Sequence, residues 1–465
     1  MKTVTHTGEI FQGDTIVAIS TALMPAGIGV VRISGRYAIT VAEQIWRPRG
    51  GANLSSRPAN AAAVGFAIAQ GQDLDECVAL IFRAPHSYTG EDVIEISCHG
   101  GVYIVRRLLE AALAAGARLA QPGEFTKRAF MNGKLDLTRA EAVMDLIGAQ
   151  GETAARAALA QHEGALFQSI QQIKGLLVEI SADIAAWVDF PDEGVPSLEP
   201  AELQKSLENV RNTLALFAEN FRRGRVIREG IETAIVGRPN VGKSTLMNLL
   251  AGSEKSIVTA TPGTTRDVVE EQVNFAGVTL RLWDTAGLRE TDDPVEQAGV
   301  ARAKARMEQA QLVLALFDGS EPLGAEDIAV LEQVRSKKII AVVNKSDLPS
   351  RINKEYIENE IEHIVNISAA QGDGLTKLEE AVRTMTDTSG FDPGAALVAN
   401  ERQLDCVNRA ADGVTSSLDA SRSGLTLDAV SVGITDALSA LCELTGEQVS
   451  EQIIDRVFEK FCIGK

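Results

Sequence analysis

Residues 237–245, GRPNVGKST, indicate the fold of the middle of this chain. The β-rich run ETAIVG (232–237) precedes it, and the helical run STLMNLLAG (244–252) follows it. This placement fits the phosphate-binding pattern GxxxxGK[ST], in which a glycine-rich loop joins a strand to a helix. The positions that fit the pattern are Gly237, Gly242, Lys243 and Ser244.

The chemistry of that pattern predicts a nucleoside triphosphate site. Glycines allow backbone N–H groups to surround the β-phosphate, and the helix N-terminus favours negative charge. The lysine reaches the β- and γ-phosphates, and the serine hydroxyl offers a ligand to Mg²⁺. The predicted contacts in this loop are Asn240, Val241, Gly242, Lys243, Ser244 and Thr245.

A second motif, NKSD at 344–347, predicts that the base is guanine. It follows the apolar run KIIAVV (338–343), which is typical of a buried strand. Asp347 can accept hydrogen bonds from the N1–H and amino group of guanine, a pair of donors that adenine lacks. We therefore expect GTP as the nucleotide, with Asn344, Lys345 and Asp347 at its base.

Three further motifs stand in the order expected of a GTPase: TPGTTRD (261–267), DTAG (284–287) and SAA (368–370). In that scheme Thr265 joins Ser244 in the Mg²⁺ shell, and Asp284 holds Mg²⁺ through water. The N–H of Gly287 senses the γ-phosphate. The remaining predicted nucleotide contacts are Thr259, Ala260, Thr261, Pro262, Gly263, Thr264, Thr265, Asp284, Thr285, Ala286, Gly287, Ser368, Ala369 and Ala370.

The position after DTAG departs from the Ras-like pattern. It is Leu288, where a glutamine that orients water would be expected. Either the domain is a slow switch, or another residue and another positive charge complete the site. The acidic loop at 288–299 offers Glu290, Asp292, Asp293 and Glu296, and Asn240 adds an oxygen that would suit a hard cation.

The rest of the chain predicts a mixed α/β and α protein. Short β-rich runs with glycine-rich turns indicate an α+β domain over 1–125. A helical pattern begins near Thr138, where Thr138 and Glu141 have capping-box spacing, and continues with Val143, Leu146 and Ile147 on one face. After the interruption at 190–200 a further helix is expected to reach about Phe221.

Alternating strands and helices over 231–386 predict a mainly parallel sheet, and helical periodicity returns after 388–394. The simplest architecture is therefore an α/β domain inserted into a helical one. The predicted segments are 1–125 (α+β), 126–228 (first helical part), 229–387 (GTPase domain) and 388–465 (second helical part).

Composition excludes several classes of protein. A net charge of −18 argues against nonspecific coating of nucleic acid, although the basic stretch 221–230 and Lys127, Arg128, Lys134 and Arg139 remain candidate contacts. No run of about 18 apolar residues could cross a bilayer, and the first residues do not resemble a signal peptide, so we expect a cytoplasmic protein. Five widely spaced cysteines predict free thiols. Cys98 and His99 are adjacent, which would place them on opposite sides of a strand and make a poor joint metal site.

The chain closely resembles the bacterial MnmE (TrmE) family of tRNA-modification GTPases over essentially its whole length. The most specific parts are GRPNVGKST, PGTTRD, DTAGLRE, GEFTKRAFMNGKLDLTRAEAV (123–143) and the terminal CIGK. This resemblance implies an N-terminal folate-binding domain, a discontinuous helical domain and an inserted Ras-like GTPase domain.

The resemblance also implies how GTP is cleaved. Asn240 and the loop TATPGT (259–264) would bind K⁺, with Thr259, Thr261 and Thr264 among its ligands, where an arginine finger would otherwise act. Glu296 would orient the attacking water through an intermediate water, while Asn240 and Lys243 assist at the phosphates. Hydrolysis would require two such domains to meet, so the resemblance implies a homodimer.

For the N-terminal domain the resemblance implies that Arg32, Glu91, Lys134 and Lys465 contact 5-formyltetrahydrofolate or a related folate. Basic groups would suit the glutamate tail, and a carboxylate would suit the donors of the pterin ring. Cys462 has two interpretations: helical spacing with Ile454 and Phe458 after Ser450 favours a packed thiol, whereas Lys460, Lys465 and the family's folate site favour a catalytic one.

The implied activity is a K⁺-stimulated GTPase that works with an FAD-dependent partner, MnmG (GidA). Together they would install a carboxymethylaminomethyl or aminomethyl group at C5 of the wobble uridine of certain tRNAs, using a folate-borne carbon. Two alternatives stay open: a regulatory GTPase switch in ribosome or RNA assembly, and a folate-dependent one-carbon enzyme that its GTPase domain merely regulates.

Overall fold

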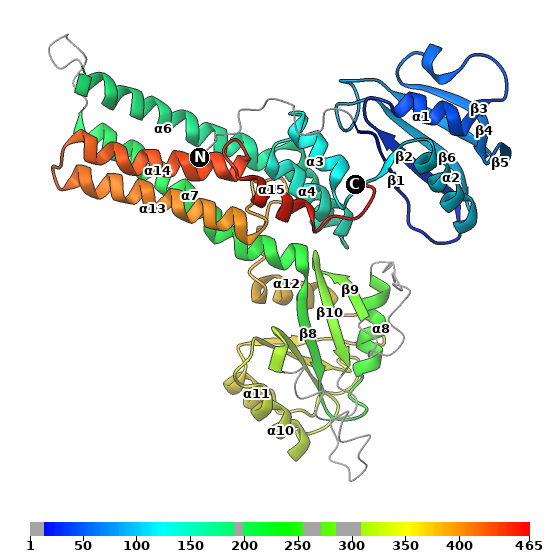
Figure 1. Ribbon diagram of the computed structural model, residues 1–465. Coiled ribbons are helices and arrows are strands. Elements are labelled where there is room, and N and C mark those ends of the chain that lie inside the picture. Colours follow the sequence, from blue (N-terminus) through cyan, green and yellow to red (C-terminus); the bar gives the residue numbers. More distant parts are fainter. Residues whose placement is uncertain (1–13, 190–198, 254–270, 285–307) are drawn as a thin grey trace, which may run out of the picture. The chain divides into compact units, whose positions relative to one another are not determined.

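The structure is a computed structural model that describes residues 14–189, 199–253, 271–284 and 308–465. Contacts divide it into two compact units, each discontinuous in sequence. The first unit contains residues 1–144, 167–211 and 409–465, and the second contains 145–166 and 212–408. Figure 1 labels many of the helices and strands of both units.

The first unit holds a seven-stranded sheet that is antiparallel except where β1 pairs with β7. In spatial order its strands are β3 (Trp46–Pro48), β4 (Ala61–Ala69), β5 (Gln72–Phe82), β6 (Val93–Gly100), β2 (Ala26–Ser34), β1 (Ile16–Ile19) and β7 (Arg118–Leu119). A short 3-10 turn, η1 (Leu54–Ser56), precedes β4.

The two faces of this sheet differ because side chains alternate along each strand. Val31 and Ile33 of β2 join a buried core with helices α1 (Ala38–Ile45) and α2 (Val102–Ala114). The opposite face of β2 carries Arg32 and Ser34, which makes that face the polar one. It is the face that positions the candidate site of the N-terminal domain.

The helices of the first unit include elements from both ends of the chain. They are α3 (Glu124–Met131), α4 (Leu137–Gly148), α6 (Ala165–Asp189), α7 (Pro200–Glu229), α13 (Glu401–Arg422), α14 (Leu427–Thr445) and α15 (Glu451–Phe458), of which α4, α6, α7 and α13 continue into the second unit. Gln204 of α7 donates to Ser421 of α13 at 3.3 Å. Lys174 of α6 forms an ion pair with Glu447, just beyond α14. The two helical parts of the sequence therefore pack together, as their neighbouring ribbons in Figure 1 also show.

The second unit is built on a six-stranded sheet in which only the edge strand β9 is antiparallel. Its order is β13 (His363–Asn366), β12 (Ile339–Asn344), β11 (Leu312–Asp318), β8 (Ile231–Val236), β10 (Val278–Asp284) and β9 (Glu271–Phe275). Because β8, β10, β11, β12 and β13 are parallel, their carboxyl ends share one edge, where open α/β sheets bind ligands.

Helices accompany this sheet, which is buried on both faces as expected for parallel strands. Every residue of β11 and of β12 is buried, so both strands are nearly continuous apolar runs. The helices of this unit are α5 (Glu152–Glu163), α8 (Lys243–Ser253), α10 (Ala325–Val334), α11 (Lys354–Glu360) and α12 (Leu375–Met385). The predicted α/β organisation over 231–386 is confirmed.

Two sequence-based element boundaries are wrong. The first turn of α4 is capped by Asp136 rather than Thr138, because Asp136 Oδ1 accepts hydrogen bonds from the backbone N–H groups of Thr138 (2.9 Å) and Arg139 (3.1 Å). Of the three apolar residues expected on one face of α4, Val143 is buried, whereas Leu146 and Ile147 are exposed.

Helix α7 continues past Phe221 to Glu229. It ends there because Gly230 adopts a positive φ of 75° while its N–H still donates to Val226 at 2.9 Å, which is a common helix ending. The basic stretch is therefore helical over 221–229, and two of its arginines are paired: Arg223 with Asp387, and Arg228 with Glu229.

Candidate functional site

The predicted phosphate loop lies at the carboxyl end of β8, directly before α8. Two of its glycines are required by the backbone, since Gly237 has a φ of 153° and Gly242 a φ of 102°. A Cβ on Gly242 would lie 2.3 Å from Nδ2 of Asn344, so a side chain has no room there. The loop can therefore approach the NKSD motif closely only because this position is glycine.

The polar groups of the loop are arranged as a phosphate site requires. Nζ of Lys243 donates to the carbonyl oxygens of Gly237 (2.6 Å) and Arg238 (3.0 Å), which keeps the ammonium over the loop. Asn240 is exposed and has a left-handed φ of 64°, and Ser244 is exposed in the first turn of α8. The first N–H groups of a helix have no partner within it, and together with the lysine they form a site for an anion.

Asn344 joins three of the predicted motifs. Its side chain is buried, its Nδ2 donates to the carbonyl of Val241 in the phosphate loop at 2.8 Å, and its Oδ1 accepts from the N–H of Ala369 at 2.9 Å. The first residue of NKSD thus ties the phosphate loop to the SAA segment. This is a structural role beside the base contact predicted from the sequence.

The carboxylate predicted to bind the base is oriented by the third motif. Oγ of Ser368 donates to Oδ1 of Asp347 at 2.6 Å and itself accepts from the N–H of Gln371 at 3.3 Å. Asp347 is exposed, whereas Ser368 is completely buried. One carboxylate oxygen is therefore fixed by the protein, and Oδ2 remains for a ligand.

Sequence reasoning missed Asp318, which completes this edge of the sheet. Its Oδ2 accepts from Nζ of Lys345 at 2.6 Å, and its Oδ1 accepts from the Ser320 hydroxyl at 2.6 Å. Burial alone would raise the pKa of Asp318, but the hydrogen bonds from Lys345 and Ser320 outweigh burial and lower it. The available signal was an acidic residue at the carboxyl end of the apolar run LVLALFD (312–318).

Several predicted residues cannot be placed around this site. Asp284 is the last residue of β10, so its backbone reaches the same edge of the sheet. The predicted residues that lie outside the described parts of the chain are Thr259, Ala260, Thr261, Pro262, Gly263, Thr264, Thr265, Thr285, Ala286, Gly287 and Glu296, together with Leu288, Glu290, Asp292 and Asp293.

The N-terminal unit holds a second candidate site on the polar face of β2. Nε of Arg32 donates to Oε1 of Glu95 at 2.7 Å, across the β2–β6 pair. The guanidinium carbon of Arg32 lies 5.5 Å from the ring centroids of both Tyr88 and Phe125. A half-buried cation is thereby held against two aromatic rings.

The C-terminal segment reaches the same face. Nη1 of Arg32 donates to the carbonyl of Gly464 at 3.3 Å, and so does the Ser20 hydroxyl at 3.3 Å. Burial and the positive charge of Arg32 lower the pKa of Lys465, while Glu95 opposes this shift. Two of the four predicted folate contacts, Arg32 and Lys465, are therefore brought together.

The other two predicted folate contacts meet on the loop between β5 and β6. Glu91 belongs to this loop, and its carboxylate accepts from the hydroxyl of Ser34 at 2.8 Å. Lys134 is exposed, and its Nζ donates to the carbonyl of Pro85 in the same loop at 3.0 Å.

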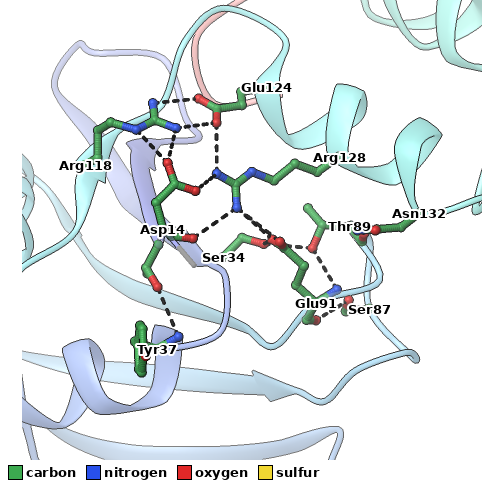
Figure 2. Close-up of polar contacts among 11 residues, drawn as sticks. Asp14, Ser34, Tyr37, Ser87, Thr89, Glu91, Arg118, Glu124, Arg128 and Asn132 are labelled. Carbon is green, nitrogen blue, oxygen red and sulfur yellow. Dashed lines mark hydrogen bonds and ion pairs between the residues drawn. The ribbon is translucent and has the colours of Figure 1, made fainter. Parts of the chain in front are cut away.

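Glu91 belongs to a charged network that the sequence did not reveal (Figure 2). Arg128 is fully buried and contacts three carboxylates, those of Asp14, Glu91 and Glu124. Arg118 contacts Asp14 and Glu124 as well, each at 2.6 Å. Glu124 is one helical turn before Arg128, but Asp14 and Glu91 are 114 and 37 residues away, which explains why no local pattern predicted the network.

The structure places the two cysteines that the sequence singled out. Helix α15 ends at Phe458, so Cys462 lies beyond the helix and is exposed, and the prediction of a packed thiol is wrong. The helix stops because Phe461 packs on Phe458, with ring centroids 5.1 Å apart, and the chain then turns to the sheet. On β6, Cys98 is buried and His99 is exposed, as alternation predicted. No cluster of three or more metal-ligating side chains occurs in the parts of the chain that the structure describes.

Family models and curated relatives together match nearly the whole chain. A family model for the MnmE helical domain matches residues 137–462, and one for the GTP-binding protein TrmE N-terminus matches 15–134. The tRNA modification GTPase MnmE of Symbiobacterium thermophilum is 43% identical over 456 residues, which cover 97% of this chain and 99% of that protein. The protein of the same name from Alkaliphilus metalliredigens is 41% identical over 463 residues, covering 98% of this chain and 100% of that protein.

Solved structures match a smaller part of the chain. The G domain of the T. maritima FeoB iron transporter covers 33% of this chain and 98% of its own, at 26% identity and a TM-score of 0.26. The relatives that match nearly the full length carry the assignment. Among the helices that the structure describes, none is long and apolar enough to cross a membrane.

Proposed function

Since this chain belongs to the MnmE family of tRNA-modification GTPases, we propose that its GTP hydrolysis is stimulated by K⁺ and serves a folate-dependent modification of tRNA. The chain is a GTP hydrolase that acts in tRNA modification, and its relatives imply GTP and Mg²⁺ as ligands. The observation that best supports GTPase activity is the pair of hydrogen bonds made by Asn344, which hold the phosphate loop and the SAA segment together at one edge of the sheet.

In the proposed mechanism, the residues of the phosphate loop bind and orient the triphosphate. Lys243 and the first turn of α8 would face the phosphates, and the Ser244 hydroxyl would be a ligand of Mg²⁺ together with Thr265. Mg²⁺ would neutralise charge that develops on the phosphate oxygens. Asp347, oriented by Ser368, would select guanine.

K⁺ would take the place of an arginine finger. The exposed, left-handed Asn240 supports this proposal, because its side-chain oxygen is available to a hard cation beside the phosphate loop. Leu288 supports it as well, since it cannot orient water and the task is then left to Glu296. The remaining K⁺ ligands would come from Thr259, Thr261 and Thr264, and two GTPase domains would meet in a homodimer.

For the N-terminal unit we propose binding of 5-formyltetrahydrofolate or a related folate by Arg32, Glu91, Lys134 and Lys465. The support is chemical: a cationic pair at Arg32 and Lys465 suits a glutamate tail, and the carboxylate of Glu91 suits the donors of a pterin ring. The exposed thiol of Cys462 is a proposed catalytic group beside this site.

The proposed product is a wobble uridine that carries a carboxymethylaminomethyl or aminomethyl group at C5. An FAD-dependent partner, MnmG (GidA), would supply the redox chemistry, and a cytoplasmic location would follow from the tRNA substrate. Mass spectrometry of tRNA nucleosides from cells lacking this gene tests the proposal. Wobble uridines that lack the modification, and regain it when the gene is restored, would support the proposal. Wobble uridines that remain modified would favour a regulatory switch in ribosome or RNA assembly.

The cation is tested separately by measuring GTP turnover in K⁺ and in Na⁺ at equal ionic strength. We expect turnover at least about tenfold faster in K⁺, because a fixed cation near the β–γ bridge stabilises the transition state by more than about 1.4 kcal/mol. Asn240→Ala should remove this difference. Equal rates of the wild-type protein in both salts would contradict a K⁺ mechanism.

A further inference from the structure

The carboxylate of Glu91 is held by two groups that come from different elements (Figure 2). Oγ of Ser34, at the end of β2, lies 2.8 Å from its Oε2. Nη1 of Arg128, on α3, lies 3.1 Å from Oε1 and 3.2 Å from Oε2. The side chain of Glu91 is 18% exposed while that of Arg128 is fully buried, so the carboxylate is anchored from the protein side and open on the other.

The guanidinium of Arg128 is also held by groups other than Glu91. Its Nη2 donates to Asp14 at 2.7 Å and to Glu124 at 2.9 Å, and Arg118 bridges the same two carboxylates. These four side chains form a closed ring of two positive and two negative charges. Glu91 is the third carboxylate, and among these five side chains only Arg128 pairs with it, which leaves it unused capacity to accept hydrogen bonds.

The direction of the hydroxyl hydrogen bonds follows from the acceptor. An ionised carboxylate can only accept, so Ser34 donates to Glu91. The hydroxyl of Thr89, 2.8 Å from that of Ser34, then donates to Ser34, and the N–H of Glu91 donates to Thr89 at 3.3 Å. Ser34 and Thr89 are both fully buried, and this chain of donors aligns one rotamer of Glu91.

Ser34 also relates Glu91 to the cationic half of the site. It stands two positions after Arg32 on β2, and residues at that spacing lie on the same face of a strand. Arg32 contacts the ring of Tyr88, three residues before Glu91. The face that presents the cation therefore also fixes the carboxylate.

We propose that Ser34 and Arg128 are positioning residues that hold the Glu91 carboxylate for the paired N–H donors of a folate pterin ring. The inference rests on the proposed folate site and adds the residues that give its carboxylate one geometry. Two parallel hydrogen bonds to a planar donor pair require such a fixed carboxylate, because a free rotamer would lose entropy on binding.

Calorimetric titration of the full chain with 5-formyltetrahydrofolate tests this with a double-mutant cycle. Ser34→Ala should raise the Kd about tenfold, the effect of one charge-assisted hydrogen bond. In a Glu91→Gln background the same substitution should change the Kd less than about twofold, because a residue that acts through Glu91 has nothing left to position. Arg128→Lys, which keeps the positive charge but not the planar guanidinium, should also weaken folate binding when Glu91 is present.

A matched control is Ser417→Ala, which removes another fully buried hydroxyl, one that donates to the Val430 carbonyl at 2.7 Å in the helical region. It should leave the Kd unchanged. A purely structural role for Ser34 would instead give losses that add to those of Glu91→Gln.

The outcomes separate the two levels of the argument. If the wild-type chain does not bind the folate, or if Glu91→Gln binds it normally, the proposed folate site and the positioning role both fall. If Glu91→Gln loses binding while Ser34→Ala retains it, or if their effects add, the folate site stands and the positioning role is overturned.

Discussion

Replacing Asp347 by asparagine should change the nucleotide that this chain binds. The structure fixes the geometry of the variant: Ser368 donates to Oδ1 at 2.6 Å, since its own oxygen already accepts from Gln371. In Asp347→Asn the amide oxygen should keep this bond, which places the NH₂ group where Oδ2 was. A donor would then face the donors of guanine.

The size of the effect follows from the bonds lost. Guanine offers two N–H groups to the carboxylate, and a hydrogen bond to a charged group contributes roughly 1.5–3 kcal/mol. Losing the bond to Oδ2 predicts about 1.5–3 kcal/mol, or roughly a 10- to 100-fold weaker affinity for GTP. Xanthosine triphosphate carries an acceptor in place of the amino group, so its affinity should rise.

Titration of both nucleotides into the wild type and the variant measures this exchange. Asp373→Asn is the matched control, because Asp373 is exposed in the same segment and contacts Ser368 through its backbone carbonyl. Unchanged GTP affinity in Asp347→Asn, or an equal loss for both nucleotides, would refute the assignment of Asp347 to the base.

Three further predictions concern the first unit. Gly433→Ala should lower the free energy of unfolding by about 1–3 kcal/mol, because a Cβ there would lie 2.3 Å from the Gly413 carbonyl, whereas Gly175→Ala, with nothing within 4 Å, should raise it by about 0.5–1 kcal/mol in urea titrations. A thiol reagent should modify the exposed Cys462 rapidly, and loss of this fast phase in Cys462→Ser checks the assignment. The buried Cys77, whose pKa is raised by burial to about 12, should react only when the protein unfolds. Burial alone would raise the pKa of Glu124, but its hydrogen bonds lower the pKa below the ordinary value of about 4.5. The stability that Glu124 contributes is therefore present above pH 4.5 and is lost as the pH falls through the lowered pKa. Glu124→Gln should flatten acid unfolding in that range, and an unchanged profile would contradict a stabilising role for the Glu124 carboxylate.

The local parts of the GTPase domain were predictable from the sequence because their determinants are local. A strand, a glycine-rich loop and a helix follow one another within 231–253, and buried parallel strands are recognisable as apolar runs. The order of the motifs then predicts that they meet at one edge of the sheet. Residue spacing did not reveal that Asn344 would join two of the motifs, because that depends on strand order.

The boundaries that failed were set by side chains beyond the pattern. Asp136 replaced Thr138 as the cap of α4, and the helix before the GTPase domain ran on until Gly230 could adopt a positive φ. Helical spacing extended to Cys462, but α15 ends at Phe458, where Phe461 packs on the Phe458 ring, and the carbonyl of Gly464 beyond it accepts from Arg32 and Ser20.

The nucleotide-binding motifs, the class of fold and the family could be predicted from the amino-acid sequence, since each depends on short runs of neighbouring residues. The network of Asp14, Glu91, Arg118, Glu124 and Arg128 emerges in the folded chain. A buried charge needs partners, and folding brings together the residue before β1, β7, α3 and the loop before β6, so that residues as far apart as 14 and 128 form an ion pair.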